Sequence, residues 1–165
     1  MLNYLFKIFD VPSEKYLIRP PGSPDETELL LTCQRCGKCA QACEYGIIKI
    51  AGGETGAAVG TPFLQLRQSY CRLCMKCIDA CENGVLKKID ERLKIGTARI
   101  DKRLCPAWKG VICMTCYSYC PNGAIDLDSE LRPEVNEKCT GCGRCETICA
   151  KYPSIKVQKE ISPIW

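Results

Sequence analysis

The sequence contains no histidine, and it has only 3 Phe and 2 Trp among its 165 residues. The missing imidazoles exclude zinc sites of the Cys2His2 and Cys3His types, together with the most common general base of enzymes. The scarcity of large aromatic side chains leaves little material for an extensive core. Small folds with a thin core are often held by disulfides or metal sites, so we expect one of these to stabilise the chain.

Long apolar segments and long basic runs are also absent. No stretch approaches the ~20 apolar residues of a membrane-spanning helix. The N-terminal MLNYLFKIFDVPSEKY has no basic leader region, twin-arginine pair or small-residue cleavage site. The longest basic run, Lys87-Lys88, is too short for a nucleic-acid surface. We therefore expect a soluble, cytoplasmic protein with no membrane span and no nucleic-acid partner.

Cysteine is the residue that the chain has in excess, with 16 copies. The pattern C-x2-C-x2-C-x3-C occurs three times unchanged, and once with its first gap stretched by the residues PAWKGVI. The four motifs, numbered 1 to 4, span residues 33–43, 71–81, 105–120 and 139–149. Their cysteines are Cys33, Cys36, Cys39, Cys43, Cys71, Cys74, Cys77, Cys81, Cys105, Cys113, Cys116, Cys120, Cys139, Cys142, Cys145 and Cys149. No cysteine lies outside a motif.

This spacing is typical of iron–sulfur ligation. In bacterial two-cluster ferredoxins, such a run gives three ligands to one cluster and its last cysteine to the other. Structural zinc more often uses separated cysteine pairs, disulfides require an oxidising compartment, and a thioredoxin-type site needs a single CxxC. None of these alternatives accounts for four copies of the longer motif. We predict that all of these cysteines hold four [4Fe-4S] clusters, and that the metal-free chain is largely disordered.

Similar flanking residues follow the motifs and indicate an internal repeat. Gly46, Gly84 and Gly123 each stand three residues after a motif's last cysteine, where they allow a tight turn. The pieces IIKI, VLKKI, ARID and AIDL read as short hairpin strands. The residues after each third cysteine read as the start of a short helix. The repeat predicts an α+β fold of tandem bacterial-ferredoxin-like units.

Two segments lie outside the repeat. Residues 1–30 contain the proline-rich RPPGSPDETE and are predicted to form an extended N-terminal arm over the surface or toward a partner. Residues 31–165 then form a double ferredoxin-like domain. Residues 51–62, which are rich in Gly and Ala, are predicted to be a loop between the first two units.

The sequence leaves two pairings of the motifs open. Sequential pairing joins motif 1 with motif 2 and motif 3 with motif 4, whereas nested pairing joins 2 with 3 and 1 with 4. We favour nesting, because similar multi-cluster subunits often nest and the loop at 51–62 could carry the chain between halves. Cys81 and Cys120 would then exchange between motifs 2 and 3, and Cys43 and Cys149 between motifs 1 and 4.

Side chains near the cysteines receive modest roles. We interpret Tyr45, Tyr117, Tyr119 and Trp108 as packing on the clusters and excluding water, and not as electron relays. We interpret Lys38, Arg72, Lys76 and Arg144 as solvated charges that offset cluster charge. Each cluster with four thiolates carries roughly −2 when oxidised, which would turn the formal net charge of +4 into about −4.

The chain resembles the NapG/MauM group of ferredoxin-type proteins. The matching stretches are RPPG (19–22), GTPFLQLRQSYC (60–71), KIGTARIDKRLCPAWKGVICMTCYSYCP (94–121) and KCTGCGRCETIC (138–149). Pro121 follows the third motif, as a proline usually does in ferredoxins, but the other motifs are followed by Glu44, Glu82 and Ala150. The resemblance implies an electron-transfer accessory protein with the motif cysteines as ligands.

The resemblance also frames the functional expectation. Periplasmic members carry a twin-arginine signal, whereas short cytoplasmic members resemble the small electron-transfer subunits of tungsten-dependent aldehyde oxidoreductases. We therefore expect a non-catalytic subunit that relays single electrons between a cytoplasmic tungsten or molybdenum enzyme and a second redox protein. The alternatives are a free polyferredoxin shuttle, a NapG-like accessory of nitrate reductase electron transfer, and a cluster carrier. Self-association that extends the relay stays open.

Overall fold

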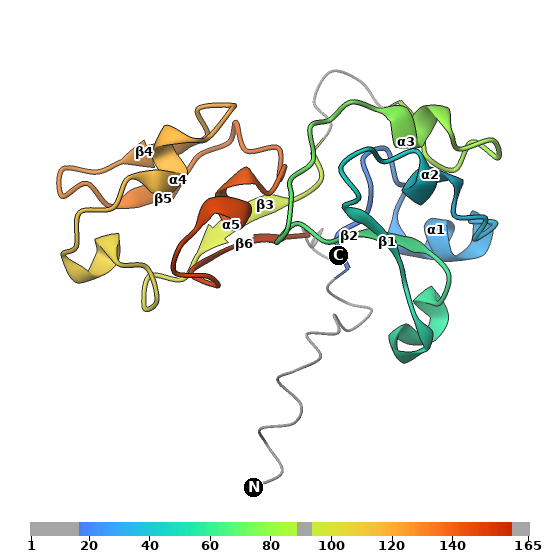
Figure 1. The fold of residues 1–165 in the computed structure, drawn as a ribbon, viewed down its shortest axis with the longest axis horizontal. Coiled ribbons are helices and arrows are strands. Elements are labelled where there is room, and N and C mark those ends of the chain that lie inside the picture. Colours follow the sequence, from blue (N-terminus) through green and yellow to red (C-terminus); the bar gives the residue numbers. More distant parts are fainter. Residues whose placement is uncertain (1–16, 89–93, 160–165) are drawn as a thin grey trace, which may run out of the picture.

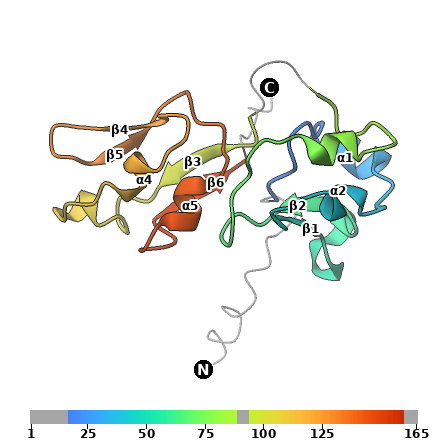
Figure 2. The same ribbon diagram turned by 45° about the horizontal axis from the view of Figure 1, so that its top comes forward.

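The computed structural model describes residues 17–88 and 94–159. Its helices and strands gather into two groups that lie side by side in both views (Figures 1 and 2). One group, the N-terminal half, contains motifs 1 and 2, and the other, the C-terminal half, contains motifs 3 and 4. No helix among these residues is long and apolar enough to pass through a membrane.

Short elements make up the N-terminal half. They are α1 (Glu26–Thr32), α2 (Lys38–Gln41), β1 (Ile48–Ile50), η3 (Gly53–Ala58), β2 (Pro62–Leu64) and α3 (Lys76–Asp79). Strands β1 and β2 pair antiparallel, with Ile48 opposite Leu64. The predicted loop at 51–62 therefore closes a hairpin inside one half, and half of it is the 3-10 helix η3.

The C-terminal half contains two antiparallel strand pairs, of which one is a hairpin. Its elements are β3 (Thr97–Ile100), η4 (Ala107–Lys109), α4 (Thr115–Ser118), β4 (Ile125–Leu127), β5 (Pro133–Val135), α5 (Arg144–Ile148) and β6 (Ile155–Gln158). Strands β4 and β5 pair antiparallel, and β3 pairs antiparallel with β6 from the end of the half. The short helices predicted at the third cysteines are confirmed, and each begins one residue before its cysteine.

The expectation of an extended arm over residues 1–30 is wrong for the part that the structure describes. Residues 17–22 are buried, and α1 follows them. The Leu64 amide donates to the Ile18 carbonyl (2.7 Å) and the Lys87 amide donates to the Gly22 carbonyl (2.9 Å). This segment therefore lies between β2 and the chain after motif 2, and it completes the N-terminal core. Residues 1–16 of the predicted arm lie outside the described residues.

One predicted strand is also wrong. Residues 85–88 of VLKKI contain no strand, although IIKI, ARID and AIDL each contribute one. Val85 and Leu86 are buried by the proline-rich segment, whose Gly22 carbonyl accepts a hydrogen bond from Lys87. This single hydrogen bond gives the Lys87 amide a partner without the repeated hydrogen bonds of a β-strand pair.

The cores of both halves are built around cysteine. In the N-terminal half, Cys39, Cys71 and Cys77 pack with aliphatic residues such as Ile47 and Leu64. The C-terminal core likewise places Cys139 and Cys145 among Ala98, Ala124, Ile125 and Ile155. Ile95 and Val157 come from the C-terminal half and belong to the first core, so the halves share buried surface.

Candidate metal centres

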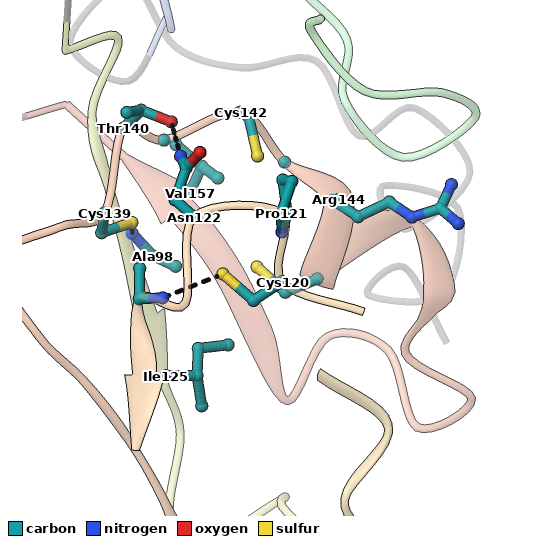
Figure 3. Close-up of a pocket in the computed structure, with 14 residues that line it drawn as sticks. Ala98, Cys120, Pro121, Asn122, Ile125, Cys139, Thr140, Cys142, Arg144 and Val157 are labelled. Carbon is teal, nitrogen blue, oxygen red and sulfur yellow. Dashed lines mark hydrogen bonds between the residues drawn. The ribbon is translucent and has the colours of Figure 1, made fainter. Parts of the chain in front are cut away.

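Sixteen free thiols line four hollows, four to each hollow. Set I consists of Cys33, Cys36, Cys39 and Cys81. Set II consists of Cys43, Cys71, Cys74 and Cys77. Set III consists of Cys105, Cys113, Cys116 and Cys149. Set IV consists of Cys120, Cys139, Cys142 and Cys145, and Figure 3 shows its hollow. Each set therefore combines three cysteines of one motif with the last cysteine of another.

The pairing is sequential, and the favoured nested pairing is wrong. Cys81 of motif 2 lies with motif 1, and Cys43 of motif 1 lies with motif 2. The same exchange places Cys149 in set III and Cys120 in set IV. The physical reason is the η3 hairpin, which returns the chain to its own half.

Left-handed backbone turns wrap three of the motifs around their hollows. Arg35 and Gly37 in motif 1 have φ of 54° and 74°, and Leu73 and Met75 in motif 2 have 53° and 61°. The matching positions of motif 4 are Gly141 and Gly143, at 72° and 83°. Residues other than glycine rarely adopt this conformation, so its recurrence at equivalent positions indicates that the spacing of the thiols determines the backbone.

Motif 3 departs from this geometry. The position after Cys113 is Met114, whose φ of −114° is not left-handed. The inserted residues contain η4, and Gly110, which has a φ of 79°, caps the C-terminal end of this helix. The insertion thus brings Cys105 back to the hollow by another route, and Cys105 is buried there.

The predicted glycine turns are confirmed. Gly46, Gly84 and Gly123 all have positive φ, at 60°, 66° and 55°. Each of their amides donates to the carbonyl of the last cysteine in the motif before it, at 2.9, 2.9 and 3.3 Å. The turns direct the chain away from the hollow and into the next segment.

Backbone amides point at several of the sulfur atoms. The Ala124 amide lies 3.2 Å from Cys120 Sγ, and the Ala98 amide lies 3.4 Å from Cys139 Sγ (Figure 3). Other sets have equivalent contacts, at 3.4 Å, from Arg35 to Cys33, from Leu73 to Cys71 and from Leu86 to Cys81. Such donors stabilise negative charge on sulfur and tune the potential of a bound cluster.

Burial raises the pKa of several metal-free thiols. Desolvation, reinforced by the neighbouring Cys71 sulfur, raises the pKa of Cys77 to about 12. Burial raises the pKa of Cys39 and of Cys116 to about 11, and nearby cysteines add to the effect. The pKa of Cys145 also rises, first through burial and then through the charges of Cys142 and Cys139. Because metal ligands must be thiolates, metal binding here releases protons.

These sets fit a polynuclear cluster better than a single ion. Within residues 17–88 and 94–159, no three Cys, Asp or Glu side chains converge as a mononuclear site requires. The thiols instead surround a space, and the walls of the set IV hollow are completed by apolar side chains such as Ile125 and Val157. Four thiolates around one hollow are the donor set of an iron–sulfur cluster.

Of the charged residues inside the motifs, the lysines of motifs 1 and 2 are exposed, as predicted, and each also forms an ion pair. Lys38 forms an ion pair with Glu82, and Lys76 forms one with Glu44. The two glutamates occupy positions where ferredoxins usually have proline. Replacing proline by glutamate therefore provides an ion-pair partner for each lysine. This pairing was missed, although motifs 1 and 2 both have a lysine before the third cysteine and a glutamate after the fourth, which was a readable signal.

The two arginines of this group stack on aromatic rings. Arg72 lies over Tyr45 and Tyr70, at 4.8 and 4.9 Å from their centroids. Arg144 lies 4.6 Å from the Tyr70 centroid, and it points away from the set IV hollow (Figure 3). Cation–π contacts of this kind hold the guanidinium groups close to the motifs. Arg72 and Arg144 also belong to the residues that border the hollows of sets II and IV.

Of the aromatic residues predicted to pack on clusters, Tyr45 alone lines a hollow, that of set II. Tyr117 and Tyr119 are 47% and 57% exposed, so the prediction is wrong for them. Trp108 packs away from the thiols, where its indole N–H donates to the Pro133 carbonyl at 3.3 Å.

Comparison with family models supports the two-by-two arrangement. A 4Fe-4S dicluster domain matches residues 32–85, which span motifs 1 and 2 together. A 4Fe-4S binding domain matches residues 136–152, which contain motif 4. The first match thus treats the N-terminal half as one unit with two clusters.

The relatives that match most of the chain are ferredoxin-type proteins. NapG of Escherichia coli is 35% identical over 160 residues, covering 85% of this chain and 69% of that protein. MauM of Methylorubrum extorquens, a methylamine utilization protein, is 34% identical and covers 83% and 70%. NapF of Escherichia coli is 32% identical and covers 80% and 79%.

A solved complex of formate dehydrogenase, heterodisulfide reductase and formylmethanofuran dehydrogenase from Methanospirillum hungatei matches with a TM-score of 0.30. The identity is 20%, and the match covers 99% of this chain and 59% of that one. That likeness is too low to support an argument. The identity with NapG and MauM over most of their length is decisive: the chain belongs to the NapG/MauM group of ferredoxin-type proteins, which makes it an iron–sulfur electron-transfer protein with four [4Fe-4S] clusters.

Proposed function

We propose that the chain is the electron-transfer subunit of an oxidoreductase complex and that it relays single electrons between a catalytic subunit and a second redox protein. Its 16 cysteines are the cluster ligands, in the sets I to IV defined above. Each half is a bacterial-ferredoxin-like unit, and together they form a double domain over residues 31–165. The chain itself performs no catalysis.

One observation carries this proposal. Within each half, the last cysteine of each motif lies in the set of its partner motif. This exchange is the ligand arrangement of two-cluster ferredoxins. It also holds the paired sets close together, because the three residues between a third and a fourth cysteine span only a short helical turn.

The chain's own residues perform three tasks in this function. When bound, a [4Fe-4S] cluster accepts and gives up one electron at a time. The thiols hold it, and buried apolar residues such as Leu64 and Ile125 keep water from it. Backbone amides that point at Sγ atoms stabilise the negative charge. No side-chain nucleophile or base is needed for this chemistry.

The partner proposed for the subunit is a cytoplasmic enzyme that contains tungsten or molybdenum, such as an aldehyde oxidoreductase. All 16 cysteines are free in the structure, and the cytoplasm keeps thiols in this state for metal binding. The short RPPG segment, with its buried Arg19, stabilises the chain and leaves partner contacts to other surfaces.

Anaerobic purification from the native host tests the proposal. Iron, sulfide, tungsten and molybdenum are quantified in the purified material, and the attached chains are identified. We expect iron and sulfide sufficient for four clusters per chain, together with a larger subunit that contains tungsten or molybdenum. A colourless preparation, or one with zinc in place of iron, would refute the ligand assignment. A chain that elutes alone with all of its clusters would instead indicate a free shuttle.

A NapG-like accessory role is the second candidate, favoured by the 35% identity with NapG of Escherichia coli. The same purification separates the two candidates, because the accessory would elute with nitrate reductase components and not with an aldehyde-oxidising enzyme. Localisation of the native protein gives an independent answer, since a periplasmic pool would support the accessory role and a cytoplasmic pool the enzyme subunit.

A further inference from the structure

The two halves meet where the chain before motif 2 contacts motif 4. The Thr147 hydroxyl donates to the Leu66 carbonyl at 2.8 Å, and Arg67 Nη1 donates to the Thr147 carbonyl at 2.9 Å. Leu66 also packs so closely on Gly143 that a Cβ at Gly143 would lie 2.7 Å from the Leu66 Cβ. This junction is therefore a specific, tightly packed contact.

A backbone hydrogen bond at the junction joins two thiol sets directly. The amide of Cys71 donates to the carbonyl of Cys142 at 2.8 Å. Cys71 belongs to set II and Cys142 to set IV. The pKa of Cys71 is raised by burial and, further, by the nearby charge of Cys142, which agrees with their proximity. Sets II and IV are therefore neighbours across the junction.

Within each half, the helices that carry the third cysteines lie together. Helix α2 contacts α3, and α4 contacts α5. These contacts bring Cys39 of set I toward Cys77 of set II, and Cys116 of set III toward Cys145 of set IV. Three neighbour relations result: I with II, II with IV, and IV with III.

We infer, resting on the proposed function, that the four sets form one line in the order I, II, IV, III and that electrons cross between the halves at the Cys71–Cys142 contact. The order in space therefore differs from the order in sequence. In each step one cluster is oxidised by one electron and its neighbour is reduced by one, and no bond forms or breaks. A one-electron donor protein gives electrons to the cluster at one end of the line, and a one-electron acceptor protein takes them from the cluster at the other end.

The surface agrees with sets I and III as the ends of the line. In the described part of the chain, the two most exposed large apolar side chains are Leu31, at 80%, and Ile112, at 78%. Leu31 stands two residues before Cys33 of set I, and Ile112 stands directly before Cys113 of set III. Exposed apolar side chains at these places fit contact with redox partners.

Two matched substitutions in the C-terminal half test the order. Cys113→Ala removes a thiol from set III, and Cys142→Ala removes one from set IV; both side chains are half-buried. Electron paramagnetic resonance of the fully reduced holoprotein reports magnetic coupling between neighbouring clusters. With set III lost, we expect the other three signals to stay coupled. With set IV lost, set III should give an isolated signal, while sets I and II stay coupled.

The N-terminal half offers the mirror-image pair. Cys36→Ala affects set I and Cys74→Ala affects set II, and both side chains are exposed. Loss of set I should leave three coupled signals, whereas loss of set II should isolate set I. An isolated set IV in Cys113→Ala, or an isolated set II in Cys36→Ala, would overturn the proposed order.

The cysteine variants could fail to fold, so a further variant tests the crossing point with every cysteine in place. Arg67→Ala with Thr147→Val removes three side-chain hydrogen bonds of the junction, one of which runs from Arg67 Nη1 to the Glu146 carbonyl at 3.4 Å. We expect unchanged iron per chain and a severalfold weaker coupling between the halves, with coupling inside each half preserved. Thr32→Val with Arg103→Ala, remote from the junction, is the control and should change neither. Unchanged coupling in the junction variant would refute the crossing point. Wild-type protein without four clusters would instead refute the proposed function.

Discussion

Lys76 and Glu44 form an ion pair that joins motif 2 to the residue after motif 1, and Lys38 and Glu82 form the reciprocal pair. The C-terminal half has no counterpart, because the matching positions hold Pro121 and Ala150. The hydrogen bond to Glu44, and then the charge of Glu44, raise the pKa of Lys76. Each pair therefore contributes one positive and one negative charge, with no net charge, beside sets I and II.

Neutralising Glu44 is predicted to raise the reduction potential of set II. The variant Glu44→Gln removes a negative charge near the cluster, which favours the reduced state. Because the pair is exposed, we expect an upward shift on the order of 10 mV that shrinks at high salt. Redox titration followed by electron paramagnetic resonance measures it. Glu130→Gln, near neither set, is the control, and a downward shift in Glu44→Gln would contradict the prediction.

Gly22 is predicted to be intolerant of alanine. Its φ is +78°, and a Cβ there would lie 2.2 Å from the Lys87 carbonyl oxygen. Strain and displaced backbone should lower the free energy of unfolding by about 2–3 kcal/mol. Anaerobic denaturant titration of the holoprotein measures this change. Gly53→Ala is the matched control, since a Cβ there meets nothing within 4 Å, and it should change stability by less than about 0.5 kcal/mol. Equal effects in both variants would count against the close contact.

The sequence predicts the local geometry of the motifs well, for a physical reason. Thiols two or three residues apart determine the backbone between them, so the short helices at Cys39 and Cys77 and the turns at Gly46 and Gly84 follow from spacing alone. Ligation type and cluster number follow in the same way from the motif count.

The pairing of motifs could not be predicted this way. Three of the four motifs have identical spacing, so nothing within a motif distinguishes its partner. The decision depends on tertiary contacts: η3 folds β2 back onto β1, and the proline-rich segment packs against both β2 and Lys87. The buried Arg19 was missed for the same reason, because its partners Thr61 and Pro62 lie far away in sequence.

Glu26 is predicted to give the fold a stability component that disappears in acid. Burial opposes its ionisation, but hydrogen bonds and charge from Arg19 and Lys159 outweigh burial and lower its pKa below the usual 4.5. A lowered pKa stabilises the fold above pH 4.5, and this contribution is lost as the pH falls through the lower value. Glu26→Gln should therefore destabilise the holoprotein at pH 7, and the difference from wild type should shrink below pH 4.5.

Denaturant midpoints across this pH range, taken anaerobically, measure the difference. At pH 7 we expect a loss of about 2 kcal/mol, because the buried Arg19 loses a charged acceptor. Glu28→Gln on the same helix is the control, since Glu28 is exposed and its variant should change stability at pH 7 by less than about 0.5 kcal/mol. A difference between Glu26→Gln and wild type that grows on acidification would oppose the assignment.

Removal of iron is predicted to unfold most of the chain. In residues 17–88 and 94–159 the regular elements are at most 7 residues long, and the two larger cores include the thiols themselves. Without metal, so little apolar burial cannot offset the loss of conformational entropy on folding. Circular dichroism before and after chelation, and again after reconstitution with iron and sulfide, measures the change. We expect loss of most of the ordered signal and its recovery, with Leu31→Ser as an exposed control that behaves as wild type. A metal-free chain that retains the holoprotein spectrum would show that packing alone determines the fold.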